Sequence, residues 1–266
     1  MEVAALMSRG EVAKAGEILK DSIRKAPSDP TLRSLLHQLN VLTGKWEAAA
    51  TQLEVYSGLE PKAALYALVQ RKLLECEAER RAVFCGERQP TLFGTPEEWM
   101  GYSVHAAALA GRGEWGAAMD LQARALERAE AVSGALNGER FQWIADGDAR
   151  LGPLLEVFVE GRYWWVPLCR LRMLKTEGPR ELLDTVWLPA RFTWANGGGA
   201  EGFVPVRYPG SETSPDPDCR LARKTLWTEV VPGMFTGDGQ RMLLTDGAEL
   251  GVLDLRQLEL DVTVPE

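Results

Sequence analysis

The composition of this 266-residue sequence changes once along the chain, and that change most constrains the fold. Alanine occurs 24 times before residue 139 and 7 times after it, whereas six of the nine tryptophans lie after it. The first stretch has helical periodicity and strong helix formers, as in residues 75–81 and 117–127. The second has short apolar or aromatic runs separated by glycine-rich turns, as at 196–199 and 237–239. The sequence therefore predicts an α+β protein with its helices first.

Three glycines of the helical stretch begin the same pattern. Gly10, Gly44 and Gly113 are each followed at +2 by valine or tryptophan and at +5 by alanine. Gly10 and Gly44 lie 34 residues apart, and Pro27 and Pro61 lie 17 residues after them. This spacing resembles the second helix of the tetratricopeptide repeat, in which a small residue admits the paired helix and proline ends the unit. Because the third unit is irregular, we expect tetratricopeptide-like helical hairpins rather than a regular array.

The two stretches predict two domains, for which the length of the chain is sufficient. Residues 1–136 are expected to form an α-helical tetratricopeptide-like domain. Residues 137–266 are expected to form an antiparallel β-rich domain with the shape of a small barrel. Residues 75–100, a charged helix followed by two prolines, fit either an interrupted repeat or a loop laid over the β-rich domain.

Charge and hydropathy narrow the classes of partner. A net charge of −8 and a pI near 5.1 disfavour nucleic acid as the main partner. The sequence does not begin with a basic segment followed by an apolar core, and nowhere do 18 apolar residues run together. Neither export nor a membrane span is therefore expected, and the expected location is the bacterial cytoplasm. Four scattered cysteines and two histidines predict neither a zinc site nor a redox pair, and no cofactor is expected.

Three carboxylates are the strongest candidates for chemistry. Asp146 and Asp148 could hold a divalent cation, but they fit better as turn residues with Arg150 as an ion-pair partner. An enzyme that uses Asp146, Asp148 and Glu212 for acid–base chemistry remains an alternative. That alternative requires the three carboxylates to converge in one cleft with perturbed pKa values.

Other motifs fit turns better than catalysis. Ser211 has no histidine after His105 to act as its base, so a serine hydrolase is disfavoured. The glycine-rich segments 196–199 and 237–239 lack the Gly-Lys-[Ser/Thr] ending of a phosphate loop. We expect Ser211 to lie in a Pro-Gly turn and the glycine-rich segments to form hairpin turns.

Aromatic residues are concentrated in the β-rich stretch. Trp164 and Trp165 are adjacent, so on a strand one is directed to the core and the other to the opposite face. A partly exposed tryptophan with apolar surroundings is a suitable anchor for an apolar helix face. We therefore hypothesise that one or two of the aromatic residues of this stretch form the wall of a peptide groove. These residues are Trp143, Tyr163, Trp164, Trp165, Trp187, Trp194 and Trp227.

Several strings after residue 140 together resemble one known family. They are FQWIADGDARLGP (141–153), GRYWWVP (161–167), VWLPA (186–190), RYPGSE (207–212), LARKTLW (221–227) and GDGQR (237–241). They resemble the ImpE, SciE or TagJ family of accessory proteins of bacterial type VI secretion, whose repeat-like helical first half extends the resemblance to the whole chain. The resemblance implies a cytoplasmic, non-enzymatic adaptor. It further implies association with an N-terminal helix of the small contractile-sheath subunit, and with sheath handling or recycling by an AAA+ ATPase.

We therefore expect an adaptor that works by contacts alone. The candidate partner contacts are Trp143, Asp146, Asp148, Arg150, Trp164, Trp165, Arg207, Tyr208, Ser211, Glu212 and Arg241. Besides the carboxylate enzyme, a two-partner scaffold unrelated to the sheath, with one partner on each domain, remains open. The sequence leaves open which domain binds the partner and whether the chain self-associates.

Overall fold

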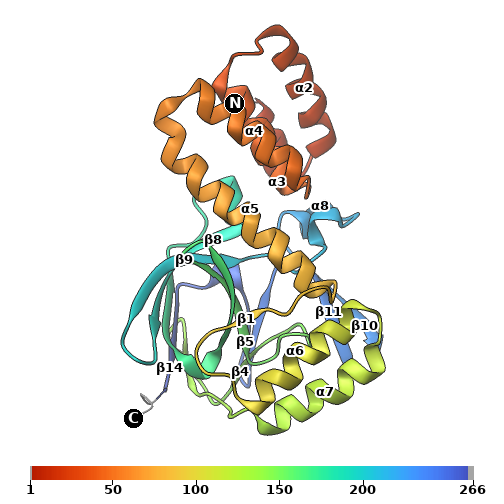
Figure 1. Cartoon of the computed structure of the whole chain (residues 1–266), viewed down its shortest axis with the longest axis vertical. Coiled ribbons are helices and arrows are strands. Elements are labelled where there is room, and N and C mark those ends of the chain that lie inside the picture. Colours follow the sequence, from red (N-terminus) through yellow and green to blue (C-terminus); the bar gives the residue numbers. More distant parts are fainter. Residues whose placement is uncertain (1, 263–266) are drawn as a thin grey trace.

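Helices come first and strands second, as the composition predicts. The computed structural model describes residues 2–262 (Figure 1). The helices of the first part are α1 (Glu2–Ser8), α2 (Val12–Lys25), α3 (Pro30–Leu42), α4 (Trp46–Leu59), η1 (Pro61–Ala63), α5 (Ala64–Phe84), α6 (Glu98–Gly111) and α7 (Trp115–Arg128). The strand-rich part also contains the short helix α8 (Pro217–Arg220) and the 3-10 turns η2 (Leu168–Arg170), η3 (Leu182–Thr185), η4 (Ser211–Thr213) and η5 (Val252–Asp254). The expected α+β class is confirmed.

The three glycine patterns mark the turns of three helical hairpins, α1–α2, α3–α4 and α6–α7. Gly10, Gly44 and Gly113 lie in these turns with φ of 82°, 66° and 80°, where an L side chain is strained. The alanines at +5 are fully buried: Ala15, Ala49 and Ala118. The hairpins do not form a continuous array, because the single 21-residue helix α5 stands between the second and the third.

The strands form three sheets. Their bounds are β1 (Thr91–Leu92), β2 (Gly134–Leu136), β3 (Glu139–Phe141), β4 (Ile144–Asp146), β5 (Leu154–Val159), β6 (Arg162–Pro167), β7 (Leu171–Thr176), β8 (Trp187–Trp194), β9 (Gly199–Pro205), β10 (Thr225–Val231), β11 (Met234–Gly239), β12 (Met242–Thr245), β13 (Glu249–Gly251) and β14 (Gln257–Leu260). The largest sheet has nine strands in the order β1-β6-β5-β9-β8-β7-β14-β2-β3. Strands β13-β12-β4 form a second sheet, and β10-β11 form a separate hairpin.

The nine-stranded sheet is open, so the expected small barrel is not formed. Its end strands, β1 and β3, do not pair with each other among the described residues. All its pairings are antiparallel except that of β1 with β6, in which Thr91 and Leu92 lie opposite Trp164 and Trp165. The chain between α5 and α6 thus covers one edge of the sheet, as one of the two alternatives for residues 75–100 requires. Covering an edge with a neighbouring segment replaces the closure that a barrel would provide.

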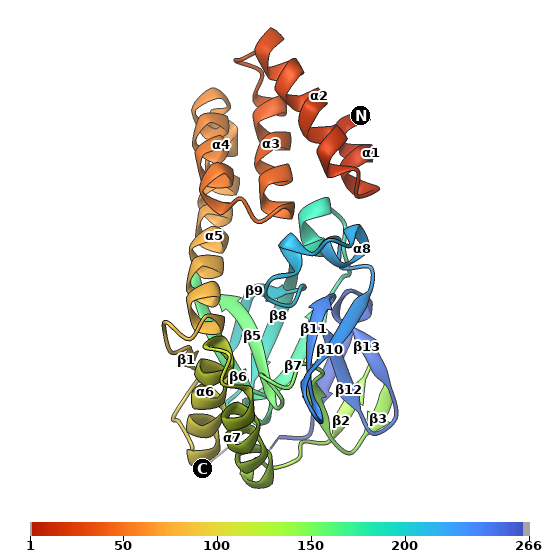
Figure 2. The same ribbon diagram turned by 90° about the vertical axis from the view of Figure 1, so that its right-hand side faces the viewer.

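Helix α5 connects the two parts of the molecule (Figure 2). It extends from the α1–α4 helices down along the sheet and contacts β6. The main apolar core follows the same path, because it includes Leu53 of α4 and Ala67 of α5 as well as Leu154 of β5 and Trp187 of β8. The division into domains at residue 136 stays a prediction, but the apolar core continues across it.

We predict that Gly44→Ala lowers the free energy of unfolding by about 1–2 kcal/mol, because the left-handed backbone strains an L residue. An added Cβ would also lie 2.3 Å from Cγ of Glu212. The control is Gly58→Ala inside α4, where nothing lies within 4 Å, and it is expected to raise stability by about 0.5–1 kcal/mol. Urea unfolding measures both. Equal effects of the two substitutions would contradict the turn assigned to Gly44.

Candidate functional site

A fully buried carboxylate, Glu156 of β5, lies between two guanidinium groups. Arg80 of α5 donates from Nε to Oε1 at 2.8 Å and from Nη2 to Oε2 at 3.1 Å. Arg241, which follows β11, donates from Nη2 to Oε2. The hydroxyl of Tyr163 donates to Oε1 and accepts from Nε1 of Trp165. Glu156 therefore has every acceptor direction committed within the protein.

Arg241 joins this carboxylate to a second one, that of Asp146. Its Nη1 donates to Oδ2 of Asp146, and its Nε donates to the carbonyl of Pro205 at 3.0 Å. The Tyr208 hydroxyl donates to Oδ1 of Asp146 at 3.0 Å, and the Asp148 backbone N–H donates to the same atom at 2.8 Å. Arg241 is completely buried, and among residues 2–262 it pairs with these two carboxylates.

Asp148 holds Arg150 and the β10–β11 hairpin. Arg150 donates to Asp148 from Nε at 2.8 Å and from Nη2 at 2.6 Å, and the backbone N–H of Gly237 donates to Oδ2 at 3.0 Å. The Arg150 guanidinium carbon lies 4.9 Å from the ring centroid of Phe84. The turn and ion-pair interpretation of the Asp-x-Asp motif therefore agrees with the structure, and both carboxylates bind groups of the protein itself.

The remaining contacts link the helices to the sheet. Glu77 of α5 accepts from Nε1 of Trp187 at 2.8 Å, and Arg80 also donates to the carbonyl of Arg207 at 2.7 Å. The Arg207 side chain donates to the carbonyls of Leu42 in α3 and of Arg220 in α8, each at 2.9 Å. We call this set of side chains the Glu156 network: Glu77, Arg80, Asp146, Asp148, Arg150, Glu156, Tyr163, Arg207, Tyr208 and Arg241.

The two carboxylates that share Arg241 have opposite pKa shifts. Burial raises the pKa of Asp146 to about 6, because the attraction of Arg241 only partly offsets it and neighbouring Asp148 adds repulsion. Burial also acts to raise the pKa of Glu156, but Arg80 and Arg241 together lower it to about 2. The difference follows from the number of guanidinium groups each carboxylate contacts, two for Glu156 and one for Asp146.

Most of the sequence-predicted contact residues are gathered in this network. Asp146, Asp148, Arg150, Arg207, Tyr208 and Arg241 all belong to it. Except for Arg150, these side chains are buried, and a buried side chain offers little surface to a partner. Partner contact at these residues stays a prediction.

The other predicted residues lie outside the network or at its margin. Trp165 is buried, whereas Trp164 is half-buried against Phe93. The Ser211 hydroxyl accepts from the Gly239 N–H at 2.7 Å and donates to the Tyr208 carbonyl at 2.7 Å, which is a turn role.

Glu212 and Trp143 retain accessible surface. Glu212 is half-buried and accepts from the Gly210 N–H. Trp143 is 41% exposed, more than any other tryptophan. These two side chains therefore remain available for contact with a partner.

Sequence reasoning missed Glu77, Arg80 and Glu156. The first two lie in the charged segment 75–81, whose sequence is typical of a solvent-exposed helix face. The available signal was Glu156 itself, a single charge within the apolar strand β5, all six residues of which are buried. A charge flanked by apolar residues on a strand requires a buried partner of opposite charge.

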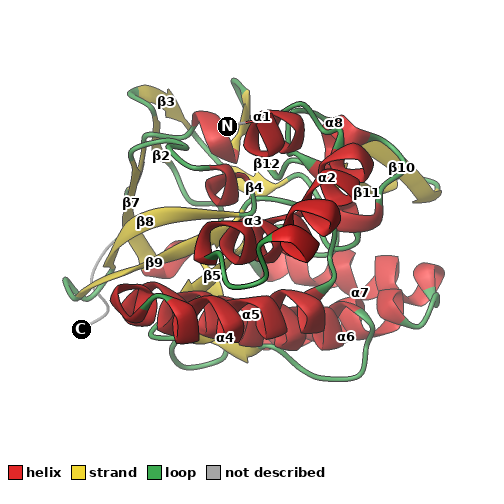
Figure 3. Cartoon of the chain, turned by 90° about the horizontal axis from the view of Figure 1, so that it is seen from above, coloured by secondary structure: helices red, strands yellow, loops and turns green. Residues whose placement is uncertain are grey.

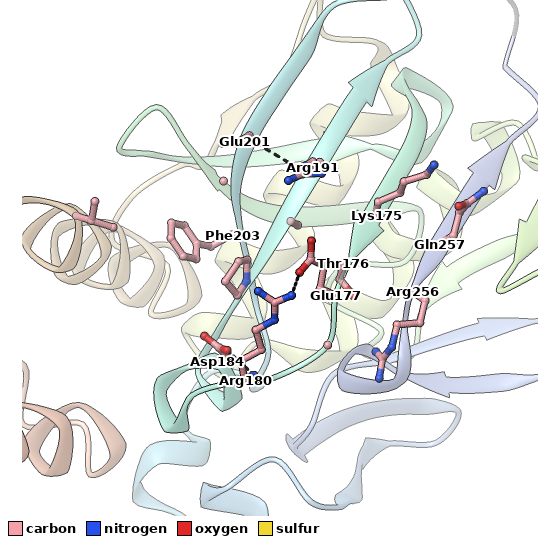
Figure 4. A pocket seen from close by; sticks show the side chains of 15 residues that line it. Lys175, Thr176, Glu177, Arg180, Asp184, Arg191, Glu201, Phe203, Arg256 and Gln257 are labelled. Carbon is pink, nitrogen blue, oxygen red and sulfur yellow. Dashed lines mark hydrogen bonds and ion pairs between the residues drawn. The ribbon is translucent and has the colours of Figure 1, made fainter. Parts of the chain in front are cut away.

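The structure also contains a groove of about 690 Å³ on the outer face of the sheet (Figure 4). Its apolar lining includes Val69 of α5, Pro189 of β8 and Phe203 of β9. Its charged lining consists of Lys175, Glu177, Arg180, Asp184, Arg191, Glu201 and Arg256. Lys175, Arg191 and Glu201 lie opposite one another on β7, β8 and β9, so they share one face of the sheet.

Two charge pairs order the rim of the groove. Arg191 donates to Glu201 at 3.2 Å, and Arg180 pairs with Glu177. Both pairs are exposed, so each contributes little to stability. The groove therefore combines an apolar patch contributed by α5, β8 and β9 with side chains of both signs of charge.

The described residues place further limits on the site. Within residues 2–262, no group of three or more His, Cys, Asp and Glu side chains is arranged to hold a metal ion. None of the helices described there combines the length and the apolar character needed to cross a membrane. The four cysteines, all within that range, are unpaired thiols.

Fold and site together define a class: helical hairpins joined to an open sheet by a buried charge network. Comparisons with known proteins identify the class. The ImpE protein family matches residues 138–259. The chain is 40% identical over 258 residues to the type VI secretion system accessory component TagJ of Pseudomonas aeruginosa, covering 97% of this chain and 90% of that protein. The chain therefore belongs to the ImpE/TagJ family, and the resemblance identified from sequence is confirmed.

A solved structure supports the fold over the whole chain. The crystal structure of protein VPA1032 from Vibrio parahaemolyticus matches with a TM-score of 0.89 and 25% sequence identity. The match covers 98% of this chain and 97% of that one. The similarity thus includes the helical part as well as the β-rich part.

We predict that Glu156→Gln lowers the free energy of unfolding by about 3–5 kcal/mol, because it leaves two buried guanidinium groups short of a counter-charge. The control is Glu75→Gln on the same helix as Arg80, where Glu75 forms an exposed pair with Lys72 at 2.7 Å. The control is expected to cost less than about 1 kcal/mol. Denaturant unfolding measures both variants, and a Glu156 variant as stable as the control would contradict the role of the network.

Acid is predicted to remove the contribution of Glu156. Because its folded pKa is about 2 against an ordinary value of 4.5, its stabilisation is complete above pH 4.5 and is lost as pH falls toward 2. The stability difference between wild type and Glu156→Gln should therefore shrink as pH falls from about 4.5 toward 2. Unfolding titrations across this range measure it. A difference that stays constant down to pH 2.5 would refute the lowered pKa.

Proposed function

We propose that this protein is a non-enzymatic cytoplasmic adaptor of a type VI secretion system. In this proposal it binds the N-terminal helix of the small contractile-sheath subunit and assists sheath handling or recycling by the AAA+ ATPase. Membership of the ImpE/TagJ family and 40% identity to a type VI accessory component support the secretion role. One observation carries the adaptor role: Asp146, Asp148 and Arg241 are bound to other side chains of the Glu156 network.

Because these side chains are bound within the protein, the structure favours a role in binding a partner over a role in catalysis. A carboxylate enzyme requires Asp146, Asp148 and Glu212 in one accessible cleft. Asp146 and Asp148 are buried and bind Arg241 and Arg150, while Glu212 binds a backbone N–H in a different turn. The raised pKa of Asp146 has a structural cause in its burial. What the chain presents to a partner is therefore shape, apolar surface and rim charge.

The groove on the sheet is the surface best suited to a helix. Helices dock into grooves through apolar residues spaced one turn apart, and Val69, Pro189 and Phe203 provide apolar contacts for such residues. Rim charges of both signs fix the orientation of a charged partner helix more than they add affinity. In this proposal the helical hairpins are tetratricopeptide-like units. Helix α5 connects the first two hairpins to the groove, because it contributes Val69 to the wall of the groove.

The first test is calorimetry of the full chain with the small sheath subunit of the same organism, with and without the N-terminal helix of that subunit. Saturable binding that disappears with the helix is expected. Absence of binding at high micromolar concentration would refute the sheath role.

The groove itself is tested by a matched pair of variants on α5. Val69→Glu introduces a carboxylate among the apolar residues of the groove and is predicted to weaken binding of the sheath subunit at least about tenfold. Leu68→Glu makes the same change at the adjacent, 53% exposed residue outside the groove, and should leave the affinity within about threefold. Trp143→Ala tests the sequence-based alternative. Loss of binding with Leu68→Glu or Trp143→Ala, but not with Val69→Glu, would place the helix elsewhere.

A further inference from the structure

The groove on the sheet has an apolar side and a cationic side. Phe203 of β9 lies on the side of α5, which contributes Val69, whereas Lys175 of β7 and Arg256, which precedes β14, lie across from Phe203 (Figure 4). In the view from above, β9 lies nearer α5 and β7 lies farther from it (Figure 3). A ligand that fills the groove therefore meets apolar groups along one flank and two cations along the other.

The carboxylates of the groove are already bound within the protein. Glu177 and Glu201 each pair with an arginine of the groove. Asp184 accepts from two backbone N–H groups of its own turn, at 2.7 and 2.9 Å. Among residues 2–262, neither Lys175 nor Arg256 forms an ion pair. The charge that the groove leaves for a ligand is therefore positive, although the chain as a whole carries a net charge of −8.

The guanidinium group of Arg256 is held in place without a ligand. Its Nη1 donates to the carbonyls of Leu253 and Leu255, each at 2.8 Å. The group lies directly over Gly178, where an added Cβ would be 2.7 Å from Cζ of Arg256. Within the described part of the chain, Nε and Nη2 donate no hydrogen bond. These two atoms form an edge with which arginine binds both oxygens of a carboxylate, and an edge already fixed loses little freedom on binding.

Lys175 places a second cation on the same side of the groove. It lies directly opposite Arg191 in the pairing of β7 with β8, and like charges directly opposite each other destabilise a sheet. Glu201 offsets this repulsion only in part, because its pair with Arg191 is exposed. An anion bound beside Lys175 would remove the repulsion. The placement of Lys175 therefore fits the binding of an anion better than it fits the stability of the sheet.

We propose that the helix bound in the groove carries carboxylate side chains along one flank of its apolar stripe, and that Arg256 and Lys175 bind them. This inference rests on the proposed function, because it takes the partner to be a helix. Successive residues of a helix lie about 100° apart around its axis, so apolar residues face Val69 and Phe203 while carboxylates on the adjacent flank face Arg256. The charge pairs set the rotation of the helix about its axis.

Calorimetry of the full chain with the small sheath subunit of the same organism tests the two cations. Arg256→Gln removes a two-point charged contact and should weaken binding about tenfold or more. Lys175→Gln removes a more exposed charge and should weaken it about threefold. The matched control is Arg172→Gln, which removes a positive charge from an exposed residue of β7 outside the groove, and it should leave the affinity within about twofold.

A double-mutant cycle tests whether carboxylates are the groups bound. In a variant sheath subunit, every Asp and Glu of the N-terminal helix is replaced by Asn or Gln. The wild-type chain should bind this subunit about tenfold more weakly, and Arg256→Gln should then cause little further loss. Arg256→Lys keeps the charge without the two-point edge and should not restore the affinity. Thermal unfolding verifies each fold, and Lys175→Gln should leave Tm at or above that of the wild type.

The outcomes separate this inference from the proposed function. Absence of binding by the wild type would overturn the proposed function and this inference with it. Binding that neither Arg256→Gln nor Lys175→Gln weakens would overturn this inference alone. So would an effect of Arg256→Gln that is as large with the amide-substituted subunit as with the unmodified one.

Discussion

The structure depends on the shared carboxylate of Glu156. Removing two guanidinium groups and a carboxylate from water is costly, and only close pairing with hydrogen bonds offsets that cost. Arg80 comes from α5, Glu156 from β5 and Arg241 from the C-terminal region, so these charges are paired only when the three elements are assembled. A displacement of α5, β5 or the segment that contains Arg241 would leave a buried charge without its partner. The pairing therefore specifies how the helical part lies on the sheet.

The pairing of Arg80 with Glu156 also fixes the position of the surfaces that we propose bind partners. Val69 precedes Arg80 by eleven residues on α5, which is about three helical turns, so the two side chains lie on nearly the same face of that helix. Fixing Arg80 at Glu156 thus fixes the wall of the groove. Asp148 holds the β10–β11 hairpin in the same way, because it binds Gly237 of that hairpin. In the proposed function, the buried side chains of the Glu156 network position the contact surfaces, and exposed apolar and charged residues of the groove contact the partner.

Local features of the fold could be predicted from the sequence, whereas the network could not. The glycines at the hairpin turns and the buried alanines at +5 follow from constraints within a few residues of one another. Arg80 and Glu156 are 76 residues apart, and Arg241 and Asp146 are 95 apart. Whether a charge is buried depends on such distant pairing, so Arg80 could not be distinguished from the exposed charges beside it. The sequence strings point to Asp146, Asp148 and Arg241 but do not indicate that these side chains are buried. The expected barrel was wrong because β1 covers one edge of the sheet instead. With only two strand residues, β1 leaves no recognisable strand pattern in the sequence.

In the proposed function, the Glu156 network holds α5 on the sheet, and the groove between them binds a partner helix. The crystal structure of the full chain bound to the N-terminal helix of the small sheath subunit tests it most directly. We predict that the helix lies across Val69 and Phe203 with the Arg80–Glu156–Arg241 contacts unchanged. A helix seated on another surface, or one bound by Asp146 or Arg241 after the network has opened, would contradict the account.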